Sequence, residues 1–266
     1  MEYKRINPTP DLLHTVESYI FLTTDKSASF TDTFFPNGKP AIVFHFKSPF
    51  SIKNNKDEWE TMPKISLVGC QSVPVTLKNE GTIDSLTVLL YPYSLYNLFK
   101  IRVEGLLTYL DGNQYFPDDF FKKLTTCPEI EKRAELLDGF FIEKLANYSP
   151  EADSFKAICD CIITKKGQIE RKDMAESFAL SENYIHKLFI KKMGISFKPY
   201  AQIVRISNII NDVYFKNTHD WIELLLEYGY YDQAHFIKDF KKITGKTPLQ
   251  YYKSDKTLTS IFSGLA

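Results

Sequence analysis

Polar side chains gather in two short stretches of the C-terminal half, residues 182–191 and 233–242. Asparagine, glutamine, histidine and lysine can hydrogen-bond base edges, and lysine also contacts phosphate groups. In both stretches these polar residues are interleaved with apolar residues at helical spacing, so each predicts an amphipathic helix with one face left free. This chemistry is typical of reading double-stranded DNA.

The first stretch follows the signals for a helix, a tight turn and a second helix. Ser181 is a good N-cap, because its hydroxyl can satisfy a backbone N–H that lacks a helical partner. The expected buried stripe consists of Ile185, Leu188 and Phe189. The residues left facing outward are Glu182, Asn183, His186, Lys187 and Lys191. With a preceding helix over Arg171–Phe178, this arrangement predicts a helix-turn-helix unit.

The same arrangement recurs in residues 218–245. Thr218 is the expected cap of a helix over His219–Tyr228, Gly229 permits a left-handed turn, and Asp232 caps the next helix. The expected buried stripe is Phe236, Ile237, Phe240 and Ile243. The outward residues are Gln233, Ala234, His235, Lys238, Lys241 and Lys242. Phe189–Gly194 and Phe240–Gly245 share their order of residue types, which indicates an internal repeat.

One continuous helix is predicted over Phe197–Tyr214, between the two units. Its length would be about 27 Å at 1.5 Å per residue. Neighbouring major-groove segments on one side of a duplex lie about 34 Å apart. A single chain is therefore expected to place two reading helices in successive major grooves.

The C-terminal region resembles the AraC-type regulators. The resemblance rests on Ala175, Ser181–Phe189, Gly194–Tyr200, Arg205, Gly229-Tyr230, His235–Lys242 and Gly245–Lys253. It implies a sequence-specific DNA-binding domain over residues 151–256, made of two helix-turn-helix units, in a bacterial transcription regulator. The family's base-reading positions fall on Asn183, His186 and Lys187, and on Gln233, Ala234 and Lys238. The full set expected at the DNA is Ser181, Asn183, His186, Lys187, Lys191, Gln233, Ala234, His235, Lys238 and Lys241.

This chain departs from the family pattern in both units. Ala179 stands where glycine is usual, and Leu225 stands where a small residue is usual. Lys187 and Lys238 replace arginines, and lysine lacks the planar fork that binds two acceptors at once. Ala234 is too short to reach a base by a hydrogen bond. We therefore expect the first unit to supply most of the base specificity and the second to anchor to the DNA backbone.

The first half is expected to be mainly β, as a small antiparallel barrel or sandwich of cupin-like type. Predicted strands are Ser18–Thr23, Pro40–Phe46, Ile65–Val68, Val73–Lys78 and Asp84–Leu90. Predicted helices are Tyr93–Phe99, Phe116–Leu124 and Pro128–Ala146. The polar segment Asn147–Asp153 predicts a domain boundary, with the β-rich domain over residues 1–150. The fold class expected for the whole chain is therefore α+β. The first half also resembles the N-terminal domain of those AraC-type regulators in which this domain senses a ligand or contacts a partner. The residues that carry this resemblance are Leu12–Tyr19, Phe35–Gly38, Val68–Gln71 and Val88–Pro92.

Composition supports this division. Residues 1–153 hold 16 basic and 21 acidic residues, whereas residues 154–266 hold 17 basic and 12 acidic residues. A basic half joined to an acidic half fits nucleic-acid binding by the former. No apolar run is long enough to span a bilayer and no signal peptide is recognised, so a cytoplasmic location is expected. Cys70, Cys127, Cys159 and Cys161 are expected to be buried free thiols; no metal site and no cofactor are expected.

Other functions stay open at this stage. An enzyme on the β-rich domain, such as an alkyl acceptor of the DNA-repair type, would need a reactive cysteine, for which Cys70 is the candidate. A protein-binding adaptor would have lost its affinity for DNA. His45 is interpreted as a structural residue, and Phe34, Phe35, Phe44, Phe46 and Phe50 as core residues or the lining of a ligand pocket. The partners to be tested are double-stranded DNA, a small-molecule effector, RNA polymerase and a second copy of the chain; Lys165-Lys166 and Lys191-Lys192 are further candidates for phosphate contacts.

Overall fold

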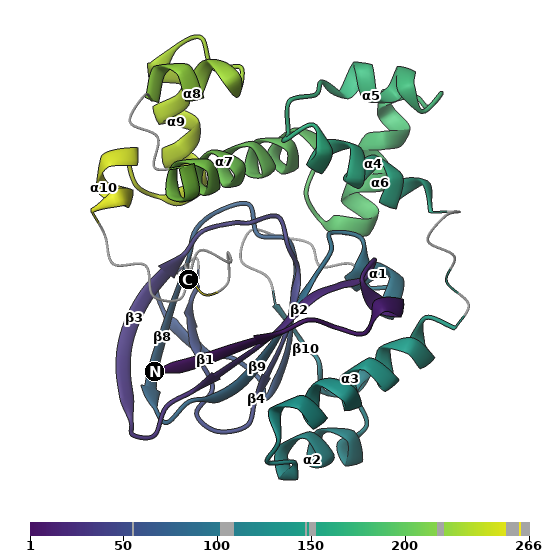
Figure 1. Cartoon of the computed structure of the whole chain (residues 1–266), viewed down its shortest axis with the longest axis vertical. Helices are drawn as coiled ribbons and strands as arrows, with labels where there is room; N and C mark the ends of the chain where they lie inside the picture. The colour runs from purple at the N-terminus through teal and green to yellow at the C-terminus, as the bar shows by residue number, and fades with distance from the viewer. Residues whose placement is uncertain are drawn as a thin grey trace.

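The structure is a computed structural model that describes residues 1–54, 56–101, 109–146, 148, 153–216, 221–253 and 261. Strands fill the first part of the described chain and helices the second (Figure 1). Two curved layers of strands lie beneath the long helix α7 (Phe197–Lys216), and the other C-terminal helices gather at its two ends (Figure 1). The predicted α+β architecture is therefore confirmed.

The strands form two antiparallel sheets. The first sheet is β1 (Glu2–Ile6), β2 (Val16–Thr23), β9 (Asp84–Leu90), β4 (Ala41–His45), β7 (Ile65–Val68) and β10 (Tyr109–Asp111), in that spatial order. The second sheet is β3 (Ala28–Phe34), β8 (Val75–Gly81), β5 (Ser51–Lys53) and β6 (Trp59–Thr61). Apolar residues of both sheets meet in one cluster. The domain is thus a sandwich, not the barrel that was the other predicted form; we call it the β-domain.

The first sheet is buried on both faces. Val88 and Ile42 are paired and belong to a cluster that helices cover. Their neighbours Leu89 and Ala41 point the other way and pack against the second sheet. Because successive strand residues point to opposite faces, a doubly covered strand reads as an almost unbroken apolar run. This is why Asp84–Leu90 was recognisable as a strand.

Three helices accompany the first sheet: α1 (Ser94–Phe99), α2 (Asp118–Thr126) and α3 (Ile130–Lys144). Leu137 and Phe141 of α3 are fully buried in the cluster on the outer face of this sheet. Arg133 of α3 pairs with Asp84 at 3.0 Å, and its guanidinium lies 4.5 Å from the centre of the Phe46 ring. Helix α3 is thereby held to the sheet by apolar packing and by a satisfied charge.

Seven helices follow in the described part of the chain. They are α4 (Ser154–Thr164), α5 (Arg171–Ser177), α6 (Glu182–Met193), α7, α8 (Trp221–Glu227), α9 (Gln233–Thr244) and α10 (Pro248–Tyr252). The expected linker helix over Phe197–Tyr214 is confirmed as α7, which is 20 residues long. Among the described helices, none combines the length and the apolar character needed to cross a membrane.

The β-domain and the C-terminal helices share a hydrophobic core. Phe35, Cys70 and Tyr93 are buried in the cluster formed by the apolar residues of the C-terminal helices. The loop that contains Gly38 comes so close to α7 that a Cβ there would lie 3.2 Å from Cε2 of Tyr200. Gly38 also has φ of +75°, in the left-handed region that glycine favours. The close contact with α7 and the backbone angle both favour glycine at this position.

Asp153 lies at the junction of the two halves. Its side chain caps α4, accepting from the backbone N–H of Phe155 at 3.0 Å. It also accepts from Asn97 of α1 at 2.9 Å and pairs with Lys192 of α6 at 3.0 Å. Burial opposes ionisation, but the hydrogen bonds from Asn97 and Lys192 outweigh it and hold the pKa of Asp153 below its usual range. This carboxylate therefore joins the β-domain to the end of α6.

The predicted strands agree with the structure where apolar content is high. Ile65–Val68 and Asp84–Leu90 coincide with β7 and β9. The sequence analysis did not predict β1, β3, β5, β6 or β10. Strand β1 carries three charged residues and lies at a sheet edge, and the chain in β3 alternates between exposed and partly buried positions. Edge strands bury little surface, so their sequences carry a weak apolar signal.

His45 lies between the two sheets. Its ring packs edge-on against Phe50, and Nδ1 lies 3.0 Å from the carbonyl oxygen of Pro63. Burial is the main cause that lowers the pKa of His45 to about 4. The ring is therefore neutral at neutral pH, with Nδ1–H donating to Pro63. These contacts favour the structural interpretation of His45.

We predict that His45 makes the fold sensitive to acid. In the unfolded chain His45 is protonated below its ordinary pKa of about 6.5, whereas in the folded chain it is protonated only below about pH 4. Stability is therefore lost as the pH falls from about 6.5, by about 3 kcal/mol in total. Replacing His45 by glutamine, which can still donate to Pro63, should flatten denaturant-unfolding stability over this pH range. An unchanged slope in His45→Gln would contradict this prediction.

Candidate nucleic-acid interface

The first helix-turn-helix unit consists of α5 and α6. The hydroxyl of Ser181 accepts a hydrogen bond from the backbone N–H of Tyr184 at 3.1 Å, so Ser181 caps α6 as predicted. Helix α6 ends at Gly194, with φ of +80°. The expected stripe of Ile185, Leu188 and Phe189 is buried. Since this stripe faces the core, the opposite side of α6 is left at the surface.

The second unit, α8 and α9, repeats these features. Asp232 caps α9 by accepting from the backbone N–H of Ala234 at 2.9 Å. Helix α9 ends at Gly245, with φ of +75°. The predicted cap Thr218 and the predicted helix start at His219 lie outside the described residues. Within the described residues, the second unit therefore has an N-cap and a terminal glycine that correspond to those of the first unit.

The two turns have the same hydrogen-bond pattern. In the first unit the N–H of Ala179 donates to Glu176 and that of Leu180 donates to Ala175. In the second the N–H of Gly229 donates to Leu226 and that of Tyr230 donates to Leu225. The residue at the turn has φ of +51° in Ala179 and +69° in Gly229. The unusual alanine therefore adopts the left-handed conformation for which the family uses glycine.

Side chains of α7 hold both units in place. At the first unit, the guanidinium of Arg205 donates to the carbonyl oxygen of Gly167 at 3.1 Å. At the second, the amide of Gln202 donates to Asp239 of α9 at 3.2 Å, and Asp239 also accepts from Tyr230. Because both units are tied to one helix, their relative position depends on α7.

The structure leaves the predicted DNA-contacting residues at the surface of α6, α9 and their N-caps. Nine of the ten are exposed and His186 is half-buried. The exposed residues are Ser181, Asn183, Lys187, Lys191, Gln233, Ala234, His235, Lys238 and Lys241. Within the described chain, Lys187, Lys238 and Lys241 form no ion pair with a carboxylate of the protein. Their charges are therefore available to an external anion.

Two other candidate lysines are engaged by the protein itself. Lys192 pairs with Asp153 and stacks over Phe155 and Tyr96. Lys166 lies 3.5 Å from Asp212 and 3.4 Å from Glu227. In these arrangements both ammonium groups already have carboxylate partners. Lys165 and Lys191 are the exposed members of the two pairs.

A polar hollow of about 490 Å³ separates the two units. Its lining combines the start of α5, the start of α7 and residues of both recognition helices, including Arg171, Lys172, Lys198, His186 and His235. The sequence analysis did not select Arg171, Lys172 or Lys198. A signal for them was available, because basic residues in the first turn of a helix lie next to the positive end of its dipole, where they are unfavourable without another role. Arg171 is paired with Glu182 at 2.9 Å, whereas Lys172 and Lys198 form no ion pair with a carboxylate within the described chain.

Cys70 has neither the exposure nor the charge state that a reactive cysteine needs. It is buried, and its thiol donates to the carbonyl oxygen of Gly38 at 3.4 Å. Burial raises the pKa of the Cys70 thiol far above its usual range, whereas nucleophilic cysteines are partly exposed thiolates. All four cysteines are free; Cys159 is buried as expected, but Cys127 and Cys161 are only half-buried.

Comparison with known proteins agrees with this geometry. A family model described as "Helix-turn-helix domain" matches residues 174–254, and one described as "Domain of unknown function (DUF6597)" matches residues 4–108. An uncharacterized HTH-type transcriptional regulator of Staphylococcus aureus is 28% identical over 101 residues, which are 37% of this chain and 13% of that protein. The uncharacterized HTH-type transcriptional regulator YbfP of Bacillus subtilis is 28% identical over 93 residues, 35% of this chain and 31% of that protein. The chain thus spans less than a third of the length of these two curated relatives.

A solved structure of ToxT from Vibrio cholerae aligns with 91% of this chain and 98% of its own, at 16% identity and a TM-score of 0.49. The C-terminal domain is a helix-turn-helix domain attached to a β-sandwich. Residues 174–254 thus match a helix-turn-helix domain, the part of the chain whose residues resemble the AraC-type regulators.

We predict that the two turns respond in opposite directions to the exchange of alanine and glycine. A left-handed conformation costs an alanine about 1 kcal/mol relative to glycine. Ala179→Gly should therefore stabilise the chain by roughly that amount, and Gly229→Ala should destabilise it similarly. Thermal unfolding of both variants measures the effect as a shift of a few degrees in Tm. Loss of stability in Ala179→Gly would show that Ala179 is unstrained.

Proposed function

We propose that this chain is a sequence-specific DNA-binding transcription regulator. The observation that carries the proposal is the pair of capped helices, α6 and α9, whose polar and basic faces are exposed on either side of one long helix. Each face combines side chains that hydrogen-bond base edges with lysines that lack a carboxylate partner within the described chain. A double-stranded DNA supplies the matching acceptors, donors and negative charge.

The length of α7 suits binding to two successive major grooves. Its 20 residues extend about 30 Å at the rise of an α-helix, close to the 34 Å of one DNA turn. In this arrangement the phosphate backbone between the two grooves passes the polar hollow. Lys172 and Lys198 in its lining would contact that backbone, whereas Arg171 is already paired with Glu182. These contacts would position the protein without reading sequence.

The two units have different roles in this proposal. The first presents Asn183, His186 and Lys187, all able to reach base edges. In the second, Ala234 offers no polar group, and the ring of His235 lies 3.5 Å from Asp239 and packs edge-on against Tyr230. The first unit accordingly supplies most of the base specificity. The second contributes mainly backbone contacts, through Lys238 and Lys241.

The β-domain is proposed to sense a small apolar molecule. A cavity of about 90 Å³ lies between its two sheets, lined mostly by apolar side chains such as Ala41, Val43 and Phe50. Asn37, Lys39 and Gln71 supply polar groups in its lining. Mainly apolar walls with a few polar groups are typical of small-molecule sites. This cavity supports an effector rather than an exclusively protein-binding role for the domain.

Sensing and DNA binding are assigned to the two proposed domains. Residues 1–150 form the sensing domain and residues 151–256 the DNA-binding domain, with Asp153 capping the first helix of the latter. Contact with RNA polymerase or with a second copy of the chain would belong to the regulatory step. A regulator of bacterial DNA would act in the cytoplasm.

We predict that Lys187→Glu and Lys238→Glu each weaken binding to double-stranded DNA. Each replacement removes a cation and adds a repelling charge, so the affinity should fall by tenfold or more at low salt. The slope of log affinity against log salt should become shallower by about one, because one fewer phosphate is neutralised by the protein. Electrophoretic mobility shift at several salt concentrations measures both. Lys132→Glu, on the distant helix α3 (Figure 1), is the matched control. Unchanged DNA binding in both variants would favour a protein-binding adaptor instead.

We predict that Asn183 and Gln233 contribute unequally to base preference. Selection of bound sequences from a random pool should show a larger loss of specificity for Asn183→Ala than for Gln233→Ala, because a hydrogen bond to a base edge provides about 1–3 kcal/mol of discrimination. Overall affinity should change less than specificity in both variants. A larger loss of specificity from Gln233→Ala would reverse the assignment of the two units.

A further inference from the structure

Ile261 lies inside the β-sandwich although it follows the DNA-binding domain in sequence. Its side chain is 5% exposed and belongs to the cluster between the two sheets. This cluster also contains Ala41, Val43 and Phe50, which line the cavity. The second sheet contributes Ile52 and Val75 to the same cluster. An isoleucine from the far end of the chain therefore packs in the same cluster as residues that line the cavity.

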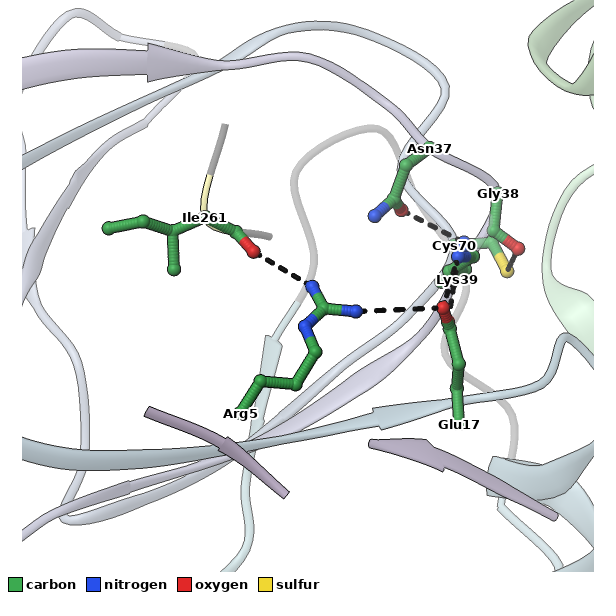
Figure 2. Close-up of polar contacts among 7 residues, drawn as sticks. All are labelled: Arg5, Glu17, Asn37, Gly38, Lys39, Cys70 and Ile261. Atoms are coloured by element: carbon green, nitrogen blue, oxygen red, sulfur yellow. Dashed lines mark hydrogen bonds and ion pairs between the residues drawn. The ribbon is translucent and has the colours of Figure 1, made fainter. Parts of the chain in front are cut away.

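The backbone of Ile261 is recognised as well as its side chain. The guanidinium of Arg5 on β1 donates to the carbonyl oxygen of Ile261 at 2.8 Å (Figure 2). Arg5 is paired in register with Ile20 of β2, so both side chains lie on the face of the first sheet that meets the second. Ile20 belongs to the same cluster as Ile261. One polar contact and one apolar contact thus define a site for a peptide residue.

Arg5 is itself held by a chain of charges that reaches the interface with α7. Its guanidinium lies 4.0 Å from Glu17, and Glu17 pairs with Lys39 at 2.7 Å (Figure 2). The backbone N–H of Lys39 donates to Asn37 at 3.0 Å. Gly38, between Asn37 and Lys39, is the residue that lies against Tyr200 of α7. The site of Ile261 and the contact with the DNA-binding domain therefore share one connected set of residues.

We infer that the β-sandwich is a peptide-binding site whose occupant is Ile261 of this same chain. Tethering to the chain raises the effective concentration of Ile261 to the millimolar range, so a weak site stays filled. Helix α10 ends at Tyr252, and Ile261 therefore fastens the end of the second helix-turn-helix unit to the β-domain. An effector that fills the cavity changes the packing of the cluster that holds Ile261 and weakens this attachment. This last step depends on the sensing role proposed above, whereas the occupancy by Ile261 does not.

The test uses the full-length Ile261→Asp variant, in which burying a carboxylate beside apolar side chains is too costly. A labelled synthetic peptide of residues 254–266 is titrated into this variant and into the unmodified chain. We expect the peptide to bind the variant at least about tenfold more tightly than the unmodified chain, whose site is filled by its own segment. A peptide with the same Ile261→Asp change should bind neither. Equal affinity for both chains, or binding to neither, would overturn the inference.

A second measurement covers the case in which Ile261→Asp does not fold. Ile261→Ala removes buried methyl groups and should speed hydrogen exchange in β1, which carries Arg5, and lower Tm by at least about 4 °C. Leu249→Ala, at an exposed leucine of α10, is the matched control and should change neither. Wild-type exchange and Tm in Ile261→Ala would contradict the inference. None of these measurements involves DNA, so a failure of the proposed function would leave them interpretable.

Discussion

The carboxylate of Asp153 is the contact on which the arrangement of the two halves depends. Asp153 directly precedes α4, caps that helix, and pairs with Lys192 near the end of α6. Asn97 of α1 completes its hydrogen bonds from the β-domain side. A buried carboxylate is stable only when its charge is compensated in this way, and removing one partner leaves an uncompensated charge. The first recognition helix is thus positioned by the residue that joins the domains.

The second unit is held to the β-domain by packing. Phe35 meets Tyr251 edge to face, with ring centres 5.5 Å apart, and a Cβ at Gly245 would lie 3.2 Å from Pro74. Phe35 follows Phe34, the last residue of β3, and Pro74 precedes Val75, the first residue of β8; Phe34 and Val75 line the cavity in the sandwich. Any change in the shape of that cavity therefore acts on loops in contact with the second unit. This is a physical link between the β-domain and the second helix-turn-helix unit that needs no displacement of whole domains.

Local signals predicted the helix-turn-helix units well because their determinants are close in sequence. Ser181 and Asp232 cap helices through their own neighbours, and Gly194 and Gly245 end them, so both recognition helices could be placed within a residue or two. The predicted stripes are buried, apart from the half-buried Ile237, because helical periodicity decides which face is apolar. The β-domain was less predictable. Strands β1 and β3 are stabilised by partners far along the chain, which no local pattern reports.

The sequence by itself determined the C-terminal fold and the exposed faces of α6 and α9, since caps, periodicity and turn residues act within a few positions. Only the tertiary structure decided that the predicted β-domain is a sandwich and that Lys166 and Lys192 are paired with carboxylates. It also decided that Cys70 is buried beneath Gly38, and that Ile261 returns to the sandwich. These outcomes depend on contacts between residues distant in sequence. Their partners become known only once the whole chain is folded.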